Sequence, residues 1–192
     1  MDKQNTISIP KIFQSDLTGA PMTHCISCEK ELIASQSDYV IEKAIKPHQG
    51  YKSYNTVFEY AMCLPCAEKL RVKISKQSMQ AMNQYFVENM NFAGRPQLDL
   101  ESESVSIDPW LEKCLVKGTY AEEIGECQIY AQCRGGELII REFPYMVSGE
   151  AIDELMQVMS AETLDEFDRL KDELIGPSEF QDLLKGGPRV FI

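Results

Sequence analysis

Seven cysteines are the residues of this 192-residue chain whose type and spacing could do chemistry. Four of them form two Cys-x-x-Cys pairs, Cys25 with Cys28 and Cys63 with Cys66. Four thiolates are the set that a tetrahedral structural zinc site takes, with zinc–sulfur distances of about 2.3 Å. Two intervening residues let the backbone turn so that both sulfurs of a pair face one ion, and the turn's amides can donate to the sulfurs. The sequence therefore predicts one zinc ion on these four cysteines.

A second interpretation concerns the later pair alone. The segment Cys63-Leu64-Pro65-Cys66 comes between a predicted strand and a predicted helix, which is also typical of thioredoxin-like redox motifs. In that alternative, Cys63 is the nucleophilic thiolate and Cys66 the resolving thiol of a thiol-disulfide oxidoreductase. It leaves the earlier pair unexplained, and no clear βαβ unit precedes the motif. The choice between zinc and iron stays open, because both metals accept tetrahedral sulfur.

The other three cysteines and both histidines carry a weaker signal. Cys127 and Cys133 are six residues apart on a predicted strand, so their side chains point to one face about 20 Å apart. They could share one ion only if the strand bends. We interpret them and Cys114 as small apolar core residues. His24 is interpreted as a surface residue beside the first pair, and His48 as part of a loop.

The cysteine pairs need elements that position them. Residues 39–45 and 56–62 are rich in β-branched and aromatic side chains, and the polar stretch 46–55 between them suits a hairpin loop. A helical pattern follows over 65–90, with Pro65 suited to the first turn. The first 20 residues are predicted to form an irregular arm. The later pair thus falls where a strand meets a helix N-terminus, which favours thiolates.

This order of cysteine turn, hairpin and cysteine-led helix resembles the treble-clef group of zinc folds. The resemblance covers residues of about 20–90 and places Cys25, Cys28, Cys63 and Cys66 at the ligand positions. It implies an architecture rather than an activity, because treble clefs serve nucleic-acid binding, protein binding and purely structural roles.

The second half of the chain has its own pattern of elements. We predict an α+β protein with a zinc module over 1–98, a linker over 99–109 and an acidic unit over 110–192. Within that unit, Gly135-Gly136 joins two predicted strands of a β-hairpin, and two or three helices follow. The predicted elements are a short amphipathic stretch near 110–116, strands over 126–134 and 137–143, and helices over 149–159, 161–174 and 178–185.

Composition limits the class of protein. Apolar residues make up 44% and charged residues 26%, which is ordinary for a soluble globular chain. No stretch approaches the roughly 20 apolar residues that span a bilayer, and the opening has no export signal. We therefore expect a cytoplasmic protein without membrane contact, in which reduced cysteines serve as ligands rather than disulfides.

Charge is divided unevenly along the chain, whose net charge is −11. Residues 1–95 hold 11 basic and 9 acidic side chains, and residues 96–192 hold 8 and 21, so the two parts carry +2 and −13. An acidic half repels phosphate backbones. Nucleic-acid binding is nevertheless a second alternative, because the loop 46–55 interleaves Lys46 and Lys52 with aromatic residues.

The acidic side chains of the second half form no recognisable catalytic or metal-binding pattern. We interpret them as solvated helix faces. The function predicted from the sequence is therefore a structural-zinc protein that acts as a binding or interaction module without catalytic activity of its own. Its expected partner is another protein or a second copy of the chain, and neither nucleic acid nor membrane is expected. The acidic residues considered are Glu150, Asp153, Glu154, Asp165, Glu166, Asp168, Asp172 and Glu173.

Overall fold

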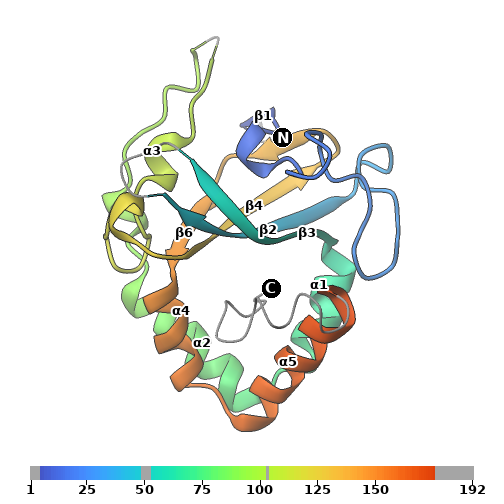
Figure 1. The fold of residues 1–192 in the computed structure, drawn as a ribbon, viewed down its shortest axis with the longest axis vertical. Helices are drawn as coiled ribbons and strands as arrows, with labels where there is room; N and C mark the ends of the chain where they lie inside the picture. Colours follow the sequence, from blue (N-terminus) through green and yellow to red (C-terminus); the bar gives the residue numbers. More distant parts are fainter. Residues whose placement is uncertain (1–4, 49–52, 103, 176–192) are drawn as a thin grey trace.

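A computed structural model describes residues 5–48, 53–102 and 104–175 as an α+β fold (Figure 1). Its strands are β1 (Thr6–Ser8), β2 (Asp38–Pro47), β3 (Tyr54–Cys63), β4 (Cys127–Arg134), β5 (Glu137–Ile139) and β6 (Tyr145–Ser148). Its α-helices are α1 (Leu64–Arg71), α2 (Lys76–Asn89), α3 (Asp108–Leu111), α4 (Gly149–Gln157) and α5 (Ala161–Ile175). Three short 3-10 helices are η1 (Lys11–Phe13), η2 (Phe92–Gly94) and η3 (Ala121–Glu123).

The six strands form one antiparallel sheet in the order β1-β5-β4-β2-β3, with β6 pairing beside β5 on β4. Both predicted hairpins are confirmed. The first joins β2 to β3, and the second joins β4 to β5 at Gly135-Gly136. Gly135 has a positive φ of 55°, which suits glycine at this tight turn.

The sheet joins segments from both predicted units. Strand β2 pairs with β4 over eight residues, from Asp38 opposite Arg134 to Ile45 opposite Cys127. Strand β1 also reaches across to β5. The predicted boundary near residue 100 therefore lies between strands of the same sheet, and a division into separate folding units stays a prediction.

The single helix predicted over 65–90 is wrong. The structure has two helices, because the chain turns after Arg71 and restarts at Ser75. Ser75 has extended backbone and caps α2, since its hydroxyl accepts a hydrogen bond from the backbone N–H of Ser78 at 3.1 Å. Ile74, in the turn, is buried. The apolar spacing continues through the turn, so periodicity alone could not reveal the break.

The irregular arm predicted for the first 20 residues is also corrected. It contains strand β1 and the 3-10 helix η1, whose Phe13 is fully buried. A three-residue strand is too short to show alternation in sequence, and β1 exists because its backbone pairs with β5.

The arm is fastened to the sheet through a buried lysine. Lys43 lies near the middle of β2 and its side chain is inaccessible to solvent. Its ammonium donates to the Gln14 backbone oxygen at 3.0 Å and pairs with the carboxylates of Asp16 at 2.9 Å and Glu59 at 3.0 Å. This network holds the arm on one face of the sheet, while α1, α2, α4 and α5 lie on the other side in Figure 1.

Two predicted helix starts in the second half are confirmed. Ser148 caps α4 by accepting from the Ala151 N–H, and Ser160 caps α5 by accepting from the Thr163 N–H. The start of α5 meets the start of α2, and four hydroxyls hydrogen-bond there at 3.0–3.2 Å. These hydroxyls belong to Ser75, Ser78, Ser160 and Thr163. The contact explains why the chain breaks at Ser75, because the α2 cap is shared with a helix 85 residues away.

The connection between the halves is fastened by Arg95. Its guanidinium lies 3.3 Å from the centre of the Trp110 ring and donates to the backbone oxygens of Glu142 and Pro144, each at 2.6 Å. Most of the connection between these contacts is exposed, as predicted. None of the helices in the described ranges is long and apolar enough to cross a membrane. The helix predicted over 178–185 lies outside the described residues.

Candidate metal centre

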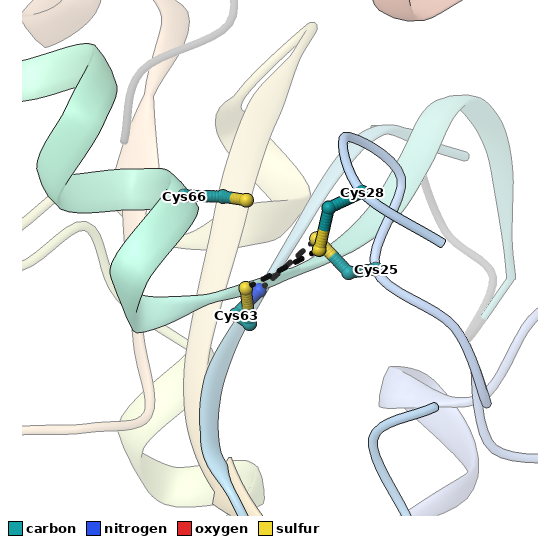
Figure 2. Close-up of side chains that lie close together, drawn as sticks. All are labelled: Cys25, Cys28, Cys63 and Cys66. Atoms are coloured by element: carbon teal, nitrogen blue, oxygen red, sulfur yellow. Dashed lines mark hydrogen bonds between the residues drawn. The ribbon is translucent and has the colours of Figure 1, made fainter. Parts of the chain in front are cut away.

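The two Cys-x-x-Cys pairs come together at one end of the β2–β3 hairpin. The sulfurs of Cys25, Cys28, Cys63 and Cys66 all lie within 4.8 Å of one another. Three of the four side chains are buried, and Cys28 is exposed. Figure 2 shows the first pair arriving from a loop and the second pair from the strand end and the helix, with the sulfurs turned toward a common point.

A compact turn presents the first pair. The Glu29 N–H donates to the Cys25 backbone oxygen at 2.8 Å, and the Cys25 N–H donates to the Lys30 oxygen at 2.9 Å. Glu29 has a φ of 57°, so the chain reverses immediately after Cys28. The turn is fixed to the sheet because the Ile26 N–H donates to the Ala61 oxygen of β3 at 2.9 Å.

The carboxylate of Glu31 orders the segment after this turn. It accepts hydrogen bonds from the backbone N–H groups of Ile33, Ala34 and Ser35 at 3.0, 2.6 and 3.1 Å. The adjoining Leu32 is fully buried. Sequence reasoning missed Glu31, although an acidic residue two to four positions before a turn is a recognisable capping signal.

The second pair is presented by the junction of β3 and α1. Cys63 ends β3 with extended backbone and occupies the N-cap of α1, so Cys66 falls in the first turn. Proline at Pro65 is tolerated there because the first helical N–H groups have no intrahelical acceptor. The helix dipole favours negative charge at this position, so both thiols lie where a thiolate is stabilised.

The spacing of the sulfurs fits a metal ion bound by four thiolates. Tetrahedral zinc with sulfur at about 2.3 Å requires sulfur–sulfur distances of about 3.8 Å. The Cys28 and Cys63 sulfurs are 3.8 Å apart, and no pair in the cluster exceeds 4.8 Å. Neither cysteine pair forms a disulfide, since all four residues are free thiols. The donor set and the geometry therefore fit a four-coordinate ion.

Backbone amides adjust the charge of the cluster. Burial opposes ionisation of Cys25, but N–H groups of Cys63, Cys28 and Ser27 donate to its sulfur and lower the pKa of this thiol to about 7. The Cys63 N–H lies 3.4 Å from that sulfur. Burial raises the pKa of Cys63 to about 12 and also raises the pKa of Cys66. The protein without metal thus holds one readily ionised thiol among protonated neighbours.

The other three cysteines are buried away from this cluster. Cys127 and Cys133 stand at opposite ends of β4, paired in register with Ile45 and Tyr39 of β2. Cys114 accepts hydrogen bonds from the backbone N–H groups of Ser148 at 3.2 Å and Lys117 at 3.3 Å. They are core residues, as the sequence predicted, and Cys114 has a hydrogen-bonding role that the sequence did not reveal.

The two histidines lie on the surface. His24 is exposed next to Cys25, and its ring is 2.9 Å from the Thr23 hydroxyl. His48 is exposed and lies 3.0 Å from the Ser53 hydroxyl. Neither belongs to the cluster of possible ligands in the described ranges.

The loop considered for nucleic-acid binding is described only in part, since residues 49–52, with Lys52, lie outside the described ranges. Lys46 at its start pairs with Glu126 at 3.2 Å. Part of its charge is therefore already compensated, and nucleic-acid binding stays a prediction.

Three comparisons with known proteins were made once this geometry was established. No protein-family model, no curated protein and no solved structure matches the chain. The function must therefore be argued from the site.

Proposed function

We propose that the protein binds one structural zinc ion through Cys25, Cys28, Cys63 and Cys66 and acts as an interaction module. The observation that carries the proposal is the convergence of these four sulfurs within 4.8 Å. Four thiolates complete the tetrahedral shell of zinc and leave no open position for a water or substrate, which is the arrangement of structural rather than catalytic sites.

The order of elements around the cluster supports a treble-clef-like module. A cysteine turn, the β2–β3 hairpin and the cysteine-led helix α1 follow one another as they do in that group. An ion held by both pairs would join the turn at Cys25 to the β3–α1 junction, which are 38 residues apart in the chain. Such a cross-link stabilises a fold chiefly where few other contacts hold the segment.

The division of charge supports the interaction role. The first 95 residues are nearly balanced and the rest carries −13, so the molecule presents electrostatically different surfaces to a partner. The partner is proposed to be another protein or a second copy of the chain.

Metal content per chain, measured together with a count of reactive thiols in the native protein, tests the zinc proposal. The protein should be purified without chelators and without a metal-affinity tag. We expect about one zinc per chain, with four thiols protected from alkylation until a chelator is added. Iron in place of zinc would give visible absorption from thiolate–iron charge transfer and would correct the identity of the metal while keeping the site.

The redox alternative makes the opposite prediction in the same experiment. A protein without metal, with a Cys63–Cys66 disulfide that forms and breaks reversibly, would replace the zinc proposal. The structure favours zinc over this alternative, because Cys63 is only 2% exposed and its sulfur contacts Cys28 of the other pair. A nucleophilic thiolate needs access to its substrate.

A further inference from the structure

A groove opens on the outside of the α1–α2 turn. Its volume is about 440 Å³, and it is lined by the end of α1, the turn and the first two turns of α2. Ile74 and Met79 supply apolar surface, and Val72 stands beside them with 85% of its surface exposed. A valine this exposed gains nothing from the fold, so apolar surface is available here to a partner.

Positive charge borders the same groove. Arg71 and Lys76 both line it and both are exposed. Within the described ranges neither forms an ion pair, whereas the neighbouring Lys73 pairs with Glu166 at 3.0 Å. The charges of Arg71 and Lys76 are therefore available to an anionic group.

The position of Lys76 adds to this potential. It is the first residue of α2, and the first turn of that helix contains no acidic residue. A helix N-terminus disfavours a cation, so Lys76 costs the helix a little stability. The positive end of the helix and the ammonium group together attract carboxylates.

The size and lining of the groove distinguish between anionic partners. Nucleic acid binds through many phosphate contacts along an extended basic surface and through aromatic stacking. This groove offers two unpaired cations and no aromatic lining residue. A short peptide segment that combines carboxylates with one bulky apolar side chain matches it better.

The rest of the molecule favours this groove over other places for such a segment. The chain as a whole carries −11, most of it in residues 96–192. Carboxylates are therefore repelled over much of the surface within a Debye length of about 8 Å, which confines an acidic partner to the basic groove. The same net charge opposes the approach of a second copy.

We propose that the groove between α1 and α2 docks a short acidic segment of a partner protein. In this arrangement a bulky apolar side chain packs on Ile74, Met79 and Val72, and carboxylates pair with Arg71 and Lys76. The proposal deepens the interaction role inferred above and rests on it.

A random dodecamer phage library selected on the full-length, metal-loaded protein tests the proposal. Enriched peptides should contain acidic residues around a large apolar residue. Binding of one such peptide, labelled with fluorescein, should weaken by about tenfold or more in the Arg71→Glu, Lys76→Glu double variant, since two attractive charges become repulsive. Val72→Ser should weaken binding by about threefold, because part of the apolar contact is lost.

A matched control changes the same charges elsewhere. Lys11 and Arg141 are exposed and lie outside the groove. The Lys11→Glu, Arg141→Glu variant has the same net charge as the groove variant and should bind the peptide within about twofold of the unmodified protein, because screening weakens distant charges. Equal weakening in both variants would show a general charge effect and overturn the proposal.

Three other outcomes would also overturn it: no enriched peptide, enriched peptides without acidic residues, or unchanged binding in the groove variant. A dimer in sedimentation velocity that the groove variant abolishes would identify a second copy as the occupant instead. Metal content and thiol protection of each variant are measured in parallel. If zinc is retained while the groove variant binds normally, the groove proposal fails and the zinc-module proposal stands.

Discussion

The seven cysteines divide into two regions of the molecule that use the same side chain differently. At the end of the β2–β3 hairpin, four sulfurs converge within 4.8 Å, and backbone N–H groups point at Cys25. In the region around β4, Cys127 and Cys133 are separated along one strand, and Cys114 accepts two backbone hydrogen bonds. Burial is similar in both, so burial alone does not distinguish a ligand from a core residue.

What distinguishes the two regions is how the backbone presents the thiols. Each pair of the cluster lies in a turn, one before the hairpin and one at a helix start, and turns aim two side chains at one point. On β4 the backbone is extended, and at about 3.3 Å per residue it carries side chains apart. Four experiments can break or sharpen this comparison.

Removal of one ligand of the cluster should have the largest effect. Cys63→Ser should abolish stoichiometric metal binding and lose most of a stabilisation on the order of 10 kcal/mol in apparent terms. Because β3 carries Cys63 and pairs with β2, the loss should spread into the sheet. Metal analysis and thermal unfolding measure it. Cys133→Ser on β4 is the control and should keep the metal; loss of the metal in that variant would contradict the division of the cysteines.

The buried lysine that anchors the arm before the cysteine turn should come next. Lys43→Met leaves the carboxylates of Asp16 and Glu59 without their cation and should lower the free energy of unfolding by about 3 kcal/mol. Chemical denaturation measures the change. Lys46→Met on the same strand removes an exposed pair with Glu126 and should cost less than about 1 kcal/mol. Equal effects would show that burial of Lys43 is unimportant.

Cys114 tests whether a sulfur outside the cluster acts as a hydrogen-bond acceptor. Cys114→Ala leaves the N–H groups of Ser148 and Lys117 without this acceptor and should cost about 1–3 kcal/mol. Cys114→Ser keeps an acceptor and should cost less. Neither variant should change metal content. If alanine were tolerated better than serine, Cys114 would be an apolar filler like its neighbours on β4.

The smallest expected effect depends on pH and concerns Asp16. Burial acts to raise the pKa of this carboxyl, but hydrogen bonds from Thr56 and Lys43 outweigh it and lower the pKa below its ordinary value of 3.8. A lowered folded-state pKa means that ionised Asp16 stabilises the fold above pH 3.8 and that this contribution is lost as the pH falls through the folded-state pKa. Asp16→Asn should therefore be less stable than the unmodified protein at pH 7, by less than about 1 kcal/mol because the group is partly exposed. The gap should close near pH 2 in urea unfolding; a gap independent of pH would assign the effect to packing.

Local signals in the sequence were sufficient for several elements. The alternation in residues 39–45 and 56–62 predicted β2 and β3, and Gly135-Gly136 predicted the second hairpin. Ser148 and Ser160 predicted the starts of α4 and α5. These features depend on residues a few positions apart, so they can be read from a short window of sequence.

Other elements depend on distant partners and escaped such reasoning. The break at Ser75 is shared with Ser160, and strand β1 exists only through its pairing with β5. Lys43 interrupts an otherwise apolar strand, and that charge was a usable signal that something must pair with it. Its partner Asp16 lies 27 residues earlier, where nothing marks it as an ion-pair residue.

The sequence by itself determined the identity of the four clustered cysteines, because the Cys-x-x-Cys spacing and its turn and helix context are local properties of the chain. The tertiary structure alone decided that β2 and β4 share a sheet across the predicted boundary, that α1 and α2 separate at a groove, and that Lys43 is buried. The physical reason is that these features depend on contacts between segments far apart in the chain, whose free energy depends on complementary surfaces that no single window of sequence contains.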